Sequence, residues 1–315
     1  MLTRQSKILL VGHDDIIERS FLNYFRSKKF ENVYSVSEMA LDTTLQSAVH
    51  DFFSQTRPEY VFLASTRSGG IEANQKYAAE FIYHNLESQN NVIHSSYKFG
   101  VKKLIFFAGS CAYPKESPQP IKEEYLGTGP LEKTSEPYAI AKMAGIHLCQ
   151  TYRAHYGVDA LVLVPATVYG PGSDADLEKA HVLGALIGKF YKAVQDNQPE
   201  VVVWGTGRAR REFLYVEDFI DGCLFLAERY RDEGIVNLGC GYDVSIQELA
   251  EMIQKISGYQ GKIIFDAAKP DGTRQKLMDH SKLAQLGWKA RVGLEEGITK
   301  TYQWYQETKR TELMK

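Results

Sequence analysis

The sequence lacks several features that would place it in a familiar class of protein. Its four cysteines lie far apart with no CxxC pair, which disfavours a structural zinc site or a disulfide framework. No apolar run approaches the roughly 18 residues of a membrane span, and the run near the N-terminus is too short for a signal peptide. The net charge of -2, with scattered Lys and Arg, gives no footprint for nucleic acid. We therefore expect a cytoplasmic protein without nucleic acid, membrane or metal partners.

Strand-like and helical segments alternate through the first half of the chain. The apolar runs KILLV, NVYSV, YVFLA, KKLIFFAG and ALVLVPA are separated by stretches long enough for helices. This rhythm is typical of βαβ units and predicts an α/β fold with a doubly wound, Rossmann-like parallel sheet. Residues 74–100 have an apolar face at helical spacing and end on Gly100, which predicts one long helix.

The pattern becomes irregular after VYGPGSDADLEKAH, which indicates a second, smaller α/β lobe that binds substrate. Short strands such as EVVVWG and GKIIFD appear there, and Ser245 with Glu248 forms a capping-box signature. The segment REFLYVEDFIDGCLFLAERY is apolar enough to pack back on the first domain. We predict a nucleotide-cofactor domain of residues 1–170 plus about 211–235, and a substrate-binding lobe of about 171–210 plus 236–315.

The turn after the first strand-like run departs from the dinucleotide-binding fingerprint. Gly12 is present, but Asp15 and Glu18 stand where the next two glycines belong, and Asp14 adds a third carboxylate. Carboxylates repel a pyrophosphate, and a Cβ crowds a turn that needs close approach. We therefore expect weak or absent binding of a dinucleotide.

Tyr138 and Lys142 are spaced i and i+4 in EPYAIAKMAG, which places them on one face of a helix. An ammonium one turn away favours the phenolate and so prepares a tyrosine for acid–base work. The spacing alone also fits a half-buried tyrosine beside a surface lysine. Support comes from FFAGSCAYP and VPATVYGP, which follow strand-like runs, because loops at the carboxyl ends of a parallel sheet form the ligand crevice.

At these residues the sequence resembles the extended short-chain dehydrogenase/reductase family, and within it the GDP-L-fucose synthases, which are GDP-4-keto-6-deoxymannose 3,5-epimerase/4-reductases. The matching stretches include GGIEAN, SCAYP, EPYAIAKMAGIHLC, VYGP, VVVWGTG, REFLYVEDF, DAAKPDGT, QLGW and TYQWY. The resemblance implies NADP in the crevice of the sheet and a GDP-sugar under the second lobe. It also implies a homodimer built partly through helices of the nucleotide domain.

The resemblance assigns roles residue by residue. Tyr138 is the acid that protonates the 4-oxygen of the sugar, and Lys142 binds the nicotinamide ribose and tunes Tyr138. Cys111 and His181 match the pair that moves protons at C3 and C5, and Ser110 is kept as a further catalytic candidate. The cofactor-binding candidates are Gly12, Leu63, Ala64, Tyr138, Lys142, Pro165 and His181.

The resemblance also assigns the GDP contacts. Trp204 and Arg211 match positions that contact the base and the phosphates, and a guanidinium suits a diphosphate because it donates two parallel bonds. Lys276 is a further phosphate candidate and Lys189 a weaker one. For any single basic residue the alternative is a solvated surface charge. We expect at least one of three neighbouring arginines to face solvent: Arg208, Arg210 and Arg211.

Gly109 stands where the family has the serine or threonine that works with the tyrosine. Ser110 is adjacent, but in a continued strand its side chain would point to the opposite face, so a donor to the 4-carbonyl is missing. The losses at Gly109 and in the glycine turn both affect reduction. Three hypotheses stay open: a working NADPH-dependent epimerase/reductase, an epimerase without the reductive step, and a non-catalytic GDP-sugar-binding partner of an active paralogue. No motif identifies the sugar, or distinguishes NADPH, NADH and no cofactor.

Overall fold

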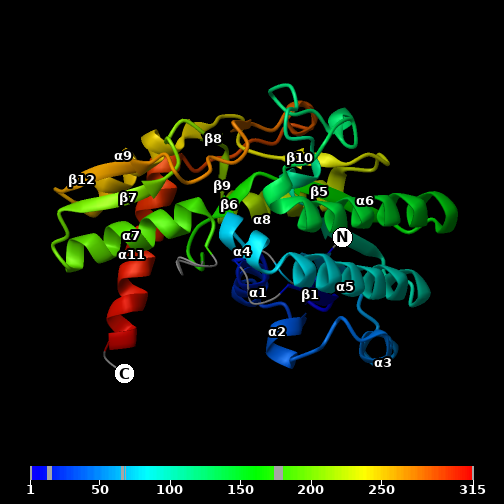
Figure 1. Cartoon of the computed structure of the whole chain (residues 1–315). Helices are drawn as coiled ribbons and strands as arrows, with labels where there is room; N and C mark the ends of the chain where they lie inside the picture. Colours follow the sequence, from blue (N-terminus) through cyan, green and yellow to red (C-terminus); the bar gives the residue numbers. More distant parts are fainter. Residues whose placement is uncertain (1, 13–15, 65–66, 68, 174–179, 314–315) are drawn as a thin grey trace.

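A six-stranded parallel sheet forms the centre of the first domain, in the order β10-β5-β4-β3-β1-β2 (Figure 1). The structure is a computed structural model that describes residues 2–12, 16–64, 67, 69–173 and 180–313, so Asp14 and Asp15 lie outside the described residues. The five predicted strands are confirmed and β10 was missed. Their bounds are Lys7–Val11 (β1), Asn32–Ser35 (β2), Tyr60–Leu63 (β3), Lys103–Phe107 (β4), Ala160–Pro165 (β5) and Val236–Leu238 (β10).

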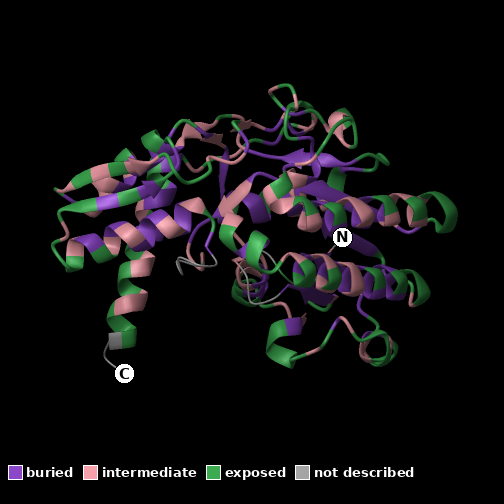
Figure 2. Ribbon diagram, in the orientation of Figure 1, coloured by how far each residue is buried: buried purple, intermediate pink, exposed green. Residues whose placement is uncertain are grey.

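Helices cover both faces of this sheet, which confirms the doubly wound fold. On one face, α3 (Gln46–Thr56), α5 (Ala78–Lys98) and α6 (Glu136–Tyr156) pack together. On the other, α1 (Ile16–Ser27) packs against α8 (Val216–Arg229). Phe21 of α1 joins these layers, since its ring centroid lies 4.8 Å from that of Phe62 in β3 and 5.7 Å from that of Phe219 in α8. Figure 2 shows the buried strands between half-buried helices.

The long helix predicted over residues 74–100 is divided in two. A short helix α4 (Ile71–Lys76) precedes α5, and Tyr77 between them leaves the helical conformation (φ -119°, ψ 34°). Hydrogen bonds still cross the bend, because the Tyr77 N–H donates to Ala73 and the Phe81 N–H donates to Tyr77. The chain therefore changes direction here without losing its backbone bonds. The predicted end holds, as Gly100 has a φ of +71°.

In the part of the chain that the structure describes, the second lobe consists of small sheets and helices (Figure 1). The strands β7 (Glu200–Trp204) and β12 (Lys262–Asp266) pair in parallel, and β8 (Arg210–Arg211) lies between β11 (Val244–Ser245) and β13 (Gln275–Lys276). The helices are α7 (Val182–Gln195), α9 (Ile246–Ser257), α10 (Ser281–Gln285) and α11 (Leu294–Leu313). The capping box predicted at Ser245 and Glu248 is confirmed at the start of α9.

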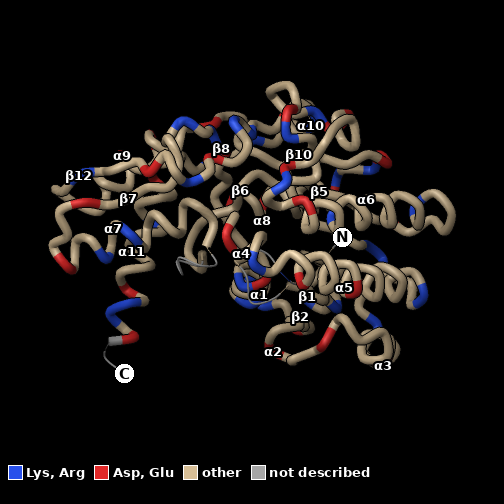
Figure 3. Tube along the Cα trace, in the orientation of Figure 1, with Lys and Arg blue, Asp and Glu red and all other residues tan. Residues whose placement is uncertain are grey.

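Two features connect the lobes. The strand β6 (Thr167–Tyr169) pairs in parallel with β9 (Phe213–Tyr215), so the chain passes between the lobes at this point. The first domain extends past the expected boundary near residue 235, because β10 pairs with β5. Acidic and basic residues are mixed over both lobes (Figure 3). Among the helices that the structure describes, none combines the length and apolarity needed to cross a bilayer.

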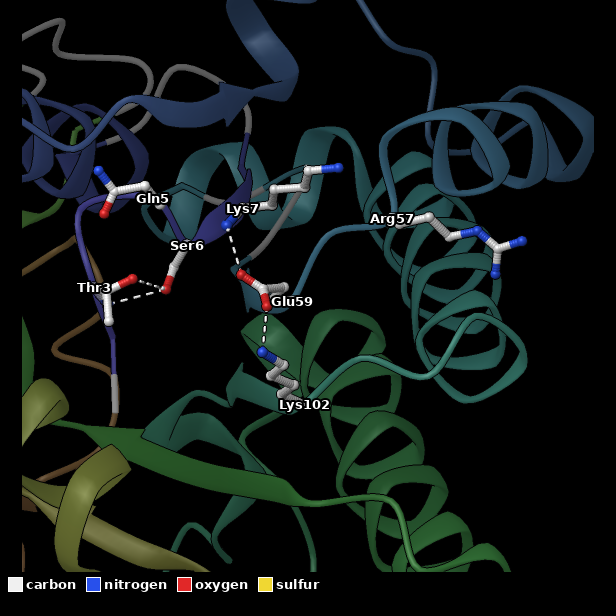
Figure 4. Close-up of a pocket in the computed structure, with 7 residues that line it drawn as sticks. All are labelled: Thr3, Gln5, Ser6, Lys7, Arg57, Glu59 and Lys102. Carbon is white, nitrogen blue, oxygen red and sulfur yellow. Dashed lines mark hydrogen bonds and ion pairs between the residues drawn. The ribbon is translucent and has the colours of Figure 1, made fainter.

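A hollow of about 570 Å³ lies at the amino ends of β1, β3 and β4, at the opposite edge of the sheet from the loops that follow β4 and β5 (Figure 4). At its centre the Glu59 carboxylate accepts hydrogen bonds from the Lys7 N–H, at 3.1 Å, and from the Lys102 ammonium. The Glu59 carboxylate and the Lys102 ammonium thus neutralise each other. The functional candidates of the sequence lie at the other edge.

Candidate active site

Gly109, Cys111 and Tyr138 meet at the carboxyl end of β4. The chain leaves β4 at Phe107 and enters a short 3-10 helix, η1 (Ser110–Ala112), for which Gly109 is the N-cap in an extended conformation (φ -124°, ψ 147°). A Cβ added at Gly109 would lie 3.1 Å from the Cys111 Sγ and 3.8 Å from the Tyr138 hydroxyl. Position 109 therefore faces the space between the thiol and the phenol, where a serine hydroxyl would reach both.

Lys142 lies one turn from Tyr138 on α6, as the spacing predicts, and its side chain is buried. Its Nζ donates a hydrogen bond of 2.9 Å to the Phe107 carbonyl and lies 5.9 Å from the centre of the Tyr138 ring. The helix can approach β4 this closely because residue 145 is glycine, and a Cβ there would overlap the Phe106 ring. A buried ammonium is thus fixed between the tyrosine and the end of β4.

The electrostatic balance at Cys111 is set by burial and by two lysines. Burial raises the pKa of the Cys111 thiol, while the charges of Lys276 and Lys142 act to lower it. Burial also lowers the pKa of Lys276, and the nearby Arg211 acts in the same direction. Because burial is the largest effect on Cys111, its thiol holds a proton near neutral pH. The lysines are placed to stabilise the thiolate once that proton leaves.

The second lobe brings Arg211 and Lys276 to this edge on neighbouring strands, where they stand in register. The Arg211 guanidinium is half-buried and donates to the carbonyls of Thr273 at 2.6 Å and Arg210 at 2.7 Å. Burial lowers the pKa of Arg211, whereas the carboxylates of Asp271 and Glu132 raise it. Two cations held in this way are suited to binding an anion beside the thiol.

Trp204 provides a flat apolar surface at the end of β7, with 43% of its area exposed. The Nζ of Lys269 lies 4.7 Å from its ring centroid, and that of Lys189 lies 5.7 Å from it. Lys189 also donates to the Val202 carbonyl at 2.8 Å, and burial lowers its pKa. An exposed ring flanked by cations is suited to stacking a nucleobase.

Asp271 links the Trp204 surface to Arg211, and sequence reasoning missed it. Its carboxylate accepts from the Thr206 N–H at 2.7 Å and from the Thr206 hydroxyl at 2.8 Å. It packs against Gly205, whose φ of +83° and lack of Cβ allow the approach. Its backbone carbonyl accepts from Arg211 at 3.4 Å. The Asp-Gly pair at 271–272 is a turn signal, but only the tertiary structure shows what that turn contacts.

The neighbouring arginines divide as expected. Arg210 forms an ion pair of 2.9 Å with Asp243, and its Nη1 lies 3.4 Å from Glu248. Arg208 is exposed. Of the three, Arg211 is therefore the one that lies beside Lys276.

The other predicted residues lie on elements around this cluster. Ser110 is the first residue of η1, so the strand-alternation reasoning does not apply to it, since the strand has already ended. His181 is the exposed N-cap of α7, adjoining residues 174–179, which lie outside the described residues. Its pairing with Cys111 stays a prediction. The remaining candidates are buried at the carboxyl ends of β1, β3 and β5: Gly12, Leu63, Ala64 and Pro165.

A buried carboxylate stands at the end of the crevice beyond β1. There the Glu18 carboxylate accepts hydrogen bonds from the Ser35 hydroxyl at 2.7 Å and from the Ser37 N–H at 3.0 Å. These groups stand at the end of β2, where the ribose of a dinucleotide binds in Rossmann-like sheets. A fixed carboxylate there opposes a 2′-phosphate.

Comparison with known proteins identifies the family of the chain. Residues 8–239 match the model of the NAD dependent epimerase/dehydratase family. GDP-L-fucose synthase 1 of Arabidopsis thaliana is 48% identical over 305 residues, which cover 97% of this chain and 94% of that protein. The structure is similar to a GDP-6-OMe-4-keto-L-xylo-heptose reductase from C. jejuni (TM-score 0.90, 34% identity, 98% of this chain, 99% of that one). It is also similar to MlghC, a GDP-mannoheptose C4 reductase from Campylobacter jejuni with NADP bound (TM-score 0.88, 35% identity, 97% and 100%). The chain therefore belongs to the NAD dependent epimerase/dehydratase family, among its GDP-L-fucose synthases.

Proposed function

We propose that the chain is a GDP-4-keto-6-deoxy-sugar epimerase/reductase of the GDP-L-fucose synthase type in which the reductive half is impaired. The observation that carries this is the cluster of Cys111, Tyr138 and Lys142 at the end of β4, facing Lys276 and Arg211 of the second lobe. The first domain supplies acid–base groups, and the second supplies cations for a diphosphate. A keto sugar linked to GDP has a complementary group for each set.

The acid–base groups suit proton transfer beside a ketone. A base removes the proton from the neighbouring carbon, the electron pair moves to the ketone oxygen, and an acid returns a proton to the opposite face. Cys111 holds its proton near neutral pH, which suits the acid. His181, exposed on the other lobe, is the base. Tyr138 is placed to donate to the ketone oxygen as its charge grows.

GDP occupies the second lobe in this proposal. Its base stacks on Trp204, and its diphosphate lies on Arg211 and Lys276. Asp271 supports both ends, since it binds the turn after Trp204 through its carboxylate and Arg211 through its carbonyl. The rigid spacing between ring and guanidinium then fixes the sugar over Cys111.

Two features support the impairment of the reductive half. Gly109 supplies no hydroxyl beside Tyr138, and Glu18 takes the donors at the end of β2. Related structures hold NADP. In this chain we expect NADPH to bind weakly, and Asp14 and Asp15 in the turn add to the repulsion of its pyrophosphate.

The test follows the exchange of protons for deuterium at C3 and C5 of the sugar. The protein is incubated in deuterated water with GDP-4-keto-6-deoxymannose and no nicotinamide cofactor, and the proton signals are followed by NMR against a no-enzyme blank. Wild type is expected to exchange both protons. Cys111→Ala and His181→Ala are expected to lose the exchange, whereas Cys240→Ser and His155→Ala, which change a cysteine and a histidine outside the cluster, should retain it.

Two outcomes redirect the proposal. If wild type shows no exchange although GDP raises its melting temperature, the chain is a non-catalytic GDP-sugar-binding partner. If exchange occurs and added NADPH gives no reduced product, it is an epimerase without the reductive step. A reduced product at the rate of the family would contradict the impairment.

We also propose that two copies associate through α5 and α6 and that the chain works in the cytoplasm. The C-terminal ends of these helices carry an aromatic patch in which the ring centroids of Tyr97 and Tyr156 lie 4.3 Å apart, with Tyr156 55% exposed. Exposed apolar patches of this kind mark interfaces between copies. Sedimentation equilibrium should show a dimer that Tyr156→Glu dissociates, and a wild-type monomer would exclude it.

All four cysteines are free, which suits a reducing compartment.

A further inference from the structure

Glu18 is a buried carboxylate at a position where the dinucleotide-binding fingerprint has a glycine. It lies in the first turn of α1, is 3% exposed, and occupies the place of a fingerprint glycine. Its Oε1 accepts from the Ser35 hydroxyl at 2.7 Å and from the Ser37 N–H at 3.0 Å, and its Oε2 accepts from the Ser37 hydroxyl. A carboxylate buried this deeply persists only because its partners satisfy it. Its orientation is therefore fixed.

These partners mark a particular place in the fold. In dinucleotide-binding sheets the group about 20 residues after the glycine turn, at the end of the second strand, meets the adenosine ribose. An acidic residue there accepts from the 2′-hydroxyl of NAD, and an arginine accommodates the 2′-phosphate of NADP. Here β2 itself ends without an acid, at Ser35, and the carboxylate reaches the same place from α1.

The nearest arginines are directed elsewhere. Arg26 forms two hydrogen bonds with the Glu38 carboxylate, at 2.8 and 2.7 Å. Arg19 donates to the Gly172 carbonyl at 2.7 Å. Both line a hollow of about 260 Å³ together with Glu18. The charged group that accepts from Ser35 and Ser37 at the end of β2 is therefore the Glu18 carboxylate.

We propose that Glu18 is the ribose-recognition group of this site, supplied by α1 in place of β2, and that it selects NADH over NADPH. A 2′-hydroxyl donates a hydrogen bond to a carboxylate, whereas a 2′-phosphate has no proton to offer near neutral pH and is repelled. This rests on the proposed function, because it concerns the cofactor of the same crevice. It adds a preference within the overall weak binding and assigns that preference to one residue.

Fluorescence titration with NADH and with NADPH tests the proposal without activity. In wild type, NADH is expected to bind at least threefold more tightly than NADPH. Glu18→Gln keeps the size and one carbonyl acceptor but removes the charge, so NADPH should bind about tenfold more tightly while NADH changes less than threefold. Glu31→Gln is the control, since it removes one exposed carboxylate that does not line this hollow and should leave the ratio unchanged.

Several results would overturn the proposal. These are tighter binding of NADPH than of NADH by wild type, equal shifts in Glu18→Gln and Glu31→Gln, or no dinucleotide binding in wild type and Glu18→Gln alike. Glu18→Gly, which restores the fingerprint glycine, replaces Glu18→Gln if the amide variant does not fold. The rise in melting temperature with GDP is measured in the same samples. If GDP does not raise the melting temperature of wild type, the proposed function is contradicted. If the ratio of NADH to NADPH affinity is the same in Glu18→Gln as in wild type, only the role of Glu18 is contradicted.

Discussion

Restoring a hydroxyl at position 109 is the sharpest perturbation of the proton-transfer cluster. Gly109 has an extended backbone that any residue adopts, so a serine meets no backbone strain. Its Cβ would lie 3.8 Å from the Tyr138 hydroxyl, which places the serine Oγ within hydrogen-bond reach of that oxygen. Gly109→Ser therefore supplies the donor that the sequence lacks.

The magnitude follows from two opposed effects. A donor aimed at a developing oxyanion accelerates reaction by about 10² to 10³. Against this, the new Cβ stands 3.1 Å from the Cys111 Sγ, which must move by a few tenths of an ångström. Crowding of this kind costs about 1 kcal/mol of stability where the crowded side chain can rotate, which is the low end of the range for overpacked cores. The gain should exceed the cost.

The assay compares Gly109→Ser with Gly109→Ala. Both add the same Cβ against Cys111, and only the serine adds a hydroxyl. Deuterium exchange at C3 and C5 without cofactor is expected to be at least tenfold faster in the serine variant than in the alanine variant. Equal rates in the two variants, with both folded by thermal melting, would show that position 109 does not face the ketone oxygen and would refute the assembly of the site around β4.

Two further predictions concern charge. A ligand selective for the native state raises the melting temperature, so Arg211→Ala should lose most of the rise that GDP causes. Arg208→Ala, which changes an exposed arginine, should keep this rise. Equal loss of the rise in both variants would mean that the phosphates lie elsewhere. Lys276→Gln should raise the pKa of Cys111, because it removes a charge that lowers it, so alkylation by iodoacetamide should need a higher pH than in wild type. Cys111→Ser gives the blank, and an unchanged or lower pH profile would contradict the placement of Lys276.

The strands of the main sheet could be predicted because they are buried on both faces and so read as continuous apolar runs. The strand β10 has only three residues, too few to give such a signal. The pairing of Tyr138 with Lys142 is set by local helix spacing, which a sequence shows directly. The position of Lys276 beside Cys111 depends on the packing of one lobe on the other, which local spacing does not encode.

Glu18 shows the limit of motif reasoning most clearly. The dinucleotide-binding fingerprint has a glycine at the position of Glu18, so the sequence predicts that the Glu18 side chain obstructs the pyrophosphate. The structure turns its carboxylate toward Ser35 and Ser37 instead, at the ribose end. Two serines near the end of a short strand carry no signal on their own, so the contact could be found only in three dimensions.

The two departures from the family act at separate ends of the crevice, and this makes a final prediction. Gly109 follows β4, and Glu18 meets the end of β2. The sheet order places β3 and β1 between those strands, a separation of about 14 Å at about 4.8 Å a strand. Substitutions this far apart act additively unless something connects them. Gly109→Ser should therefore leave the NADH/NADPH binding ratio unchanged, and Glu18→Gln should leave cofactor-free exchange unchanged. In the double variant, the exchange rate should match that of Gly109→Ser, and the NADH/NADPH binding ratio should match that of Glu18→Gln, each within about twofold. A larger deviation would mean that the ends are coupled through the protein, and that the losses at Gly109 and Glu18 are not independent.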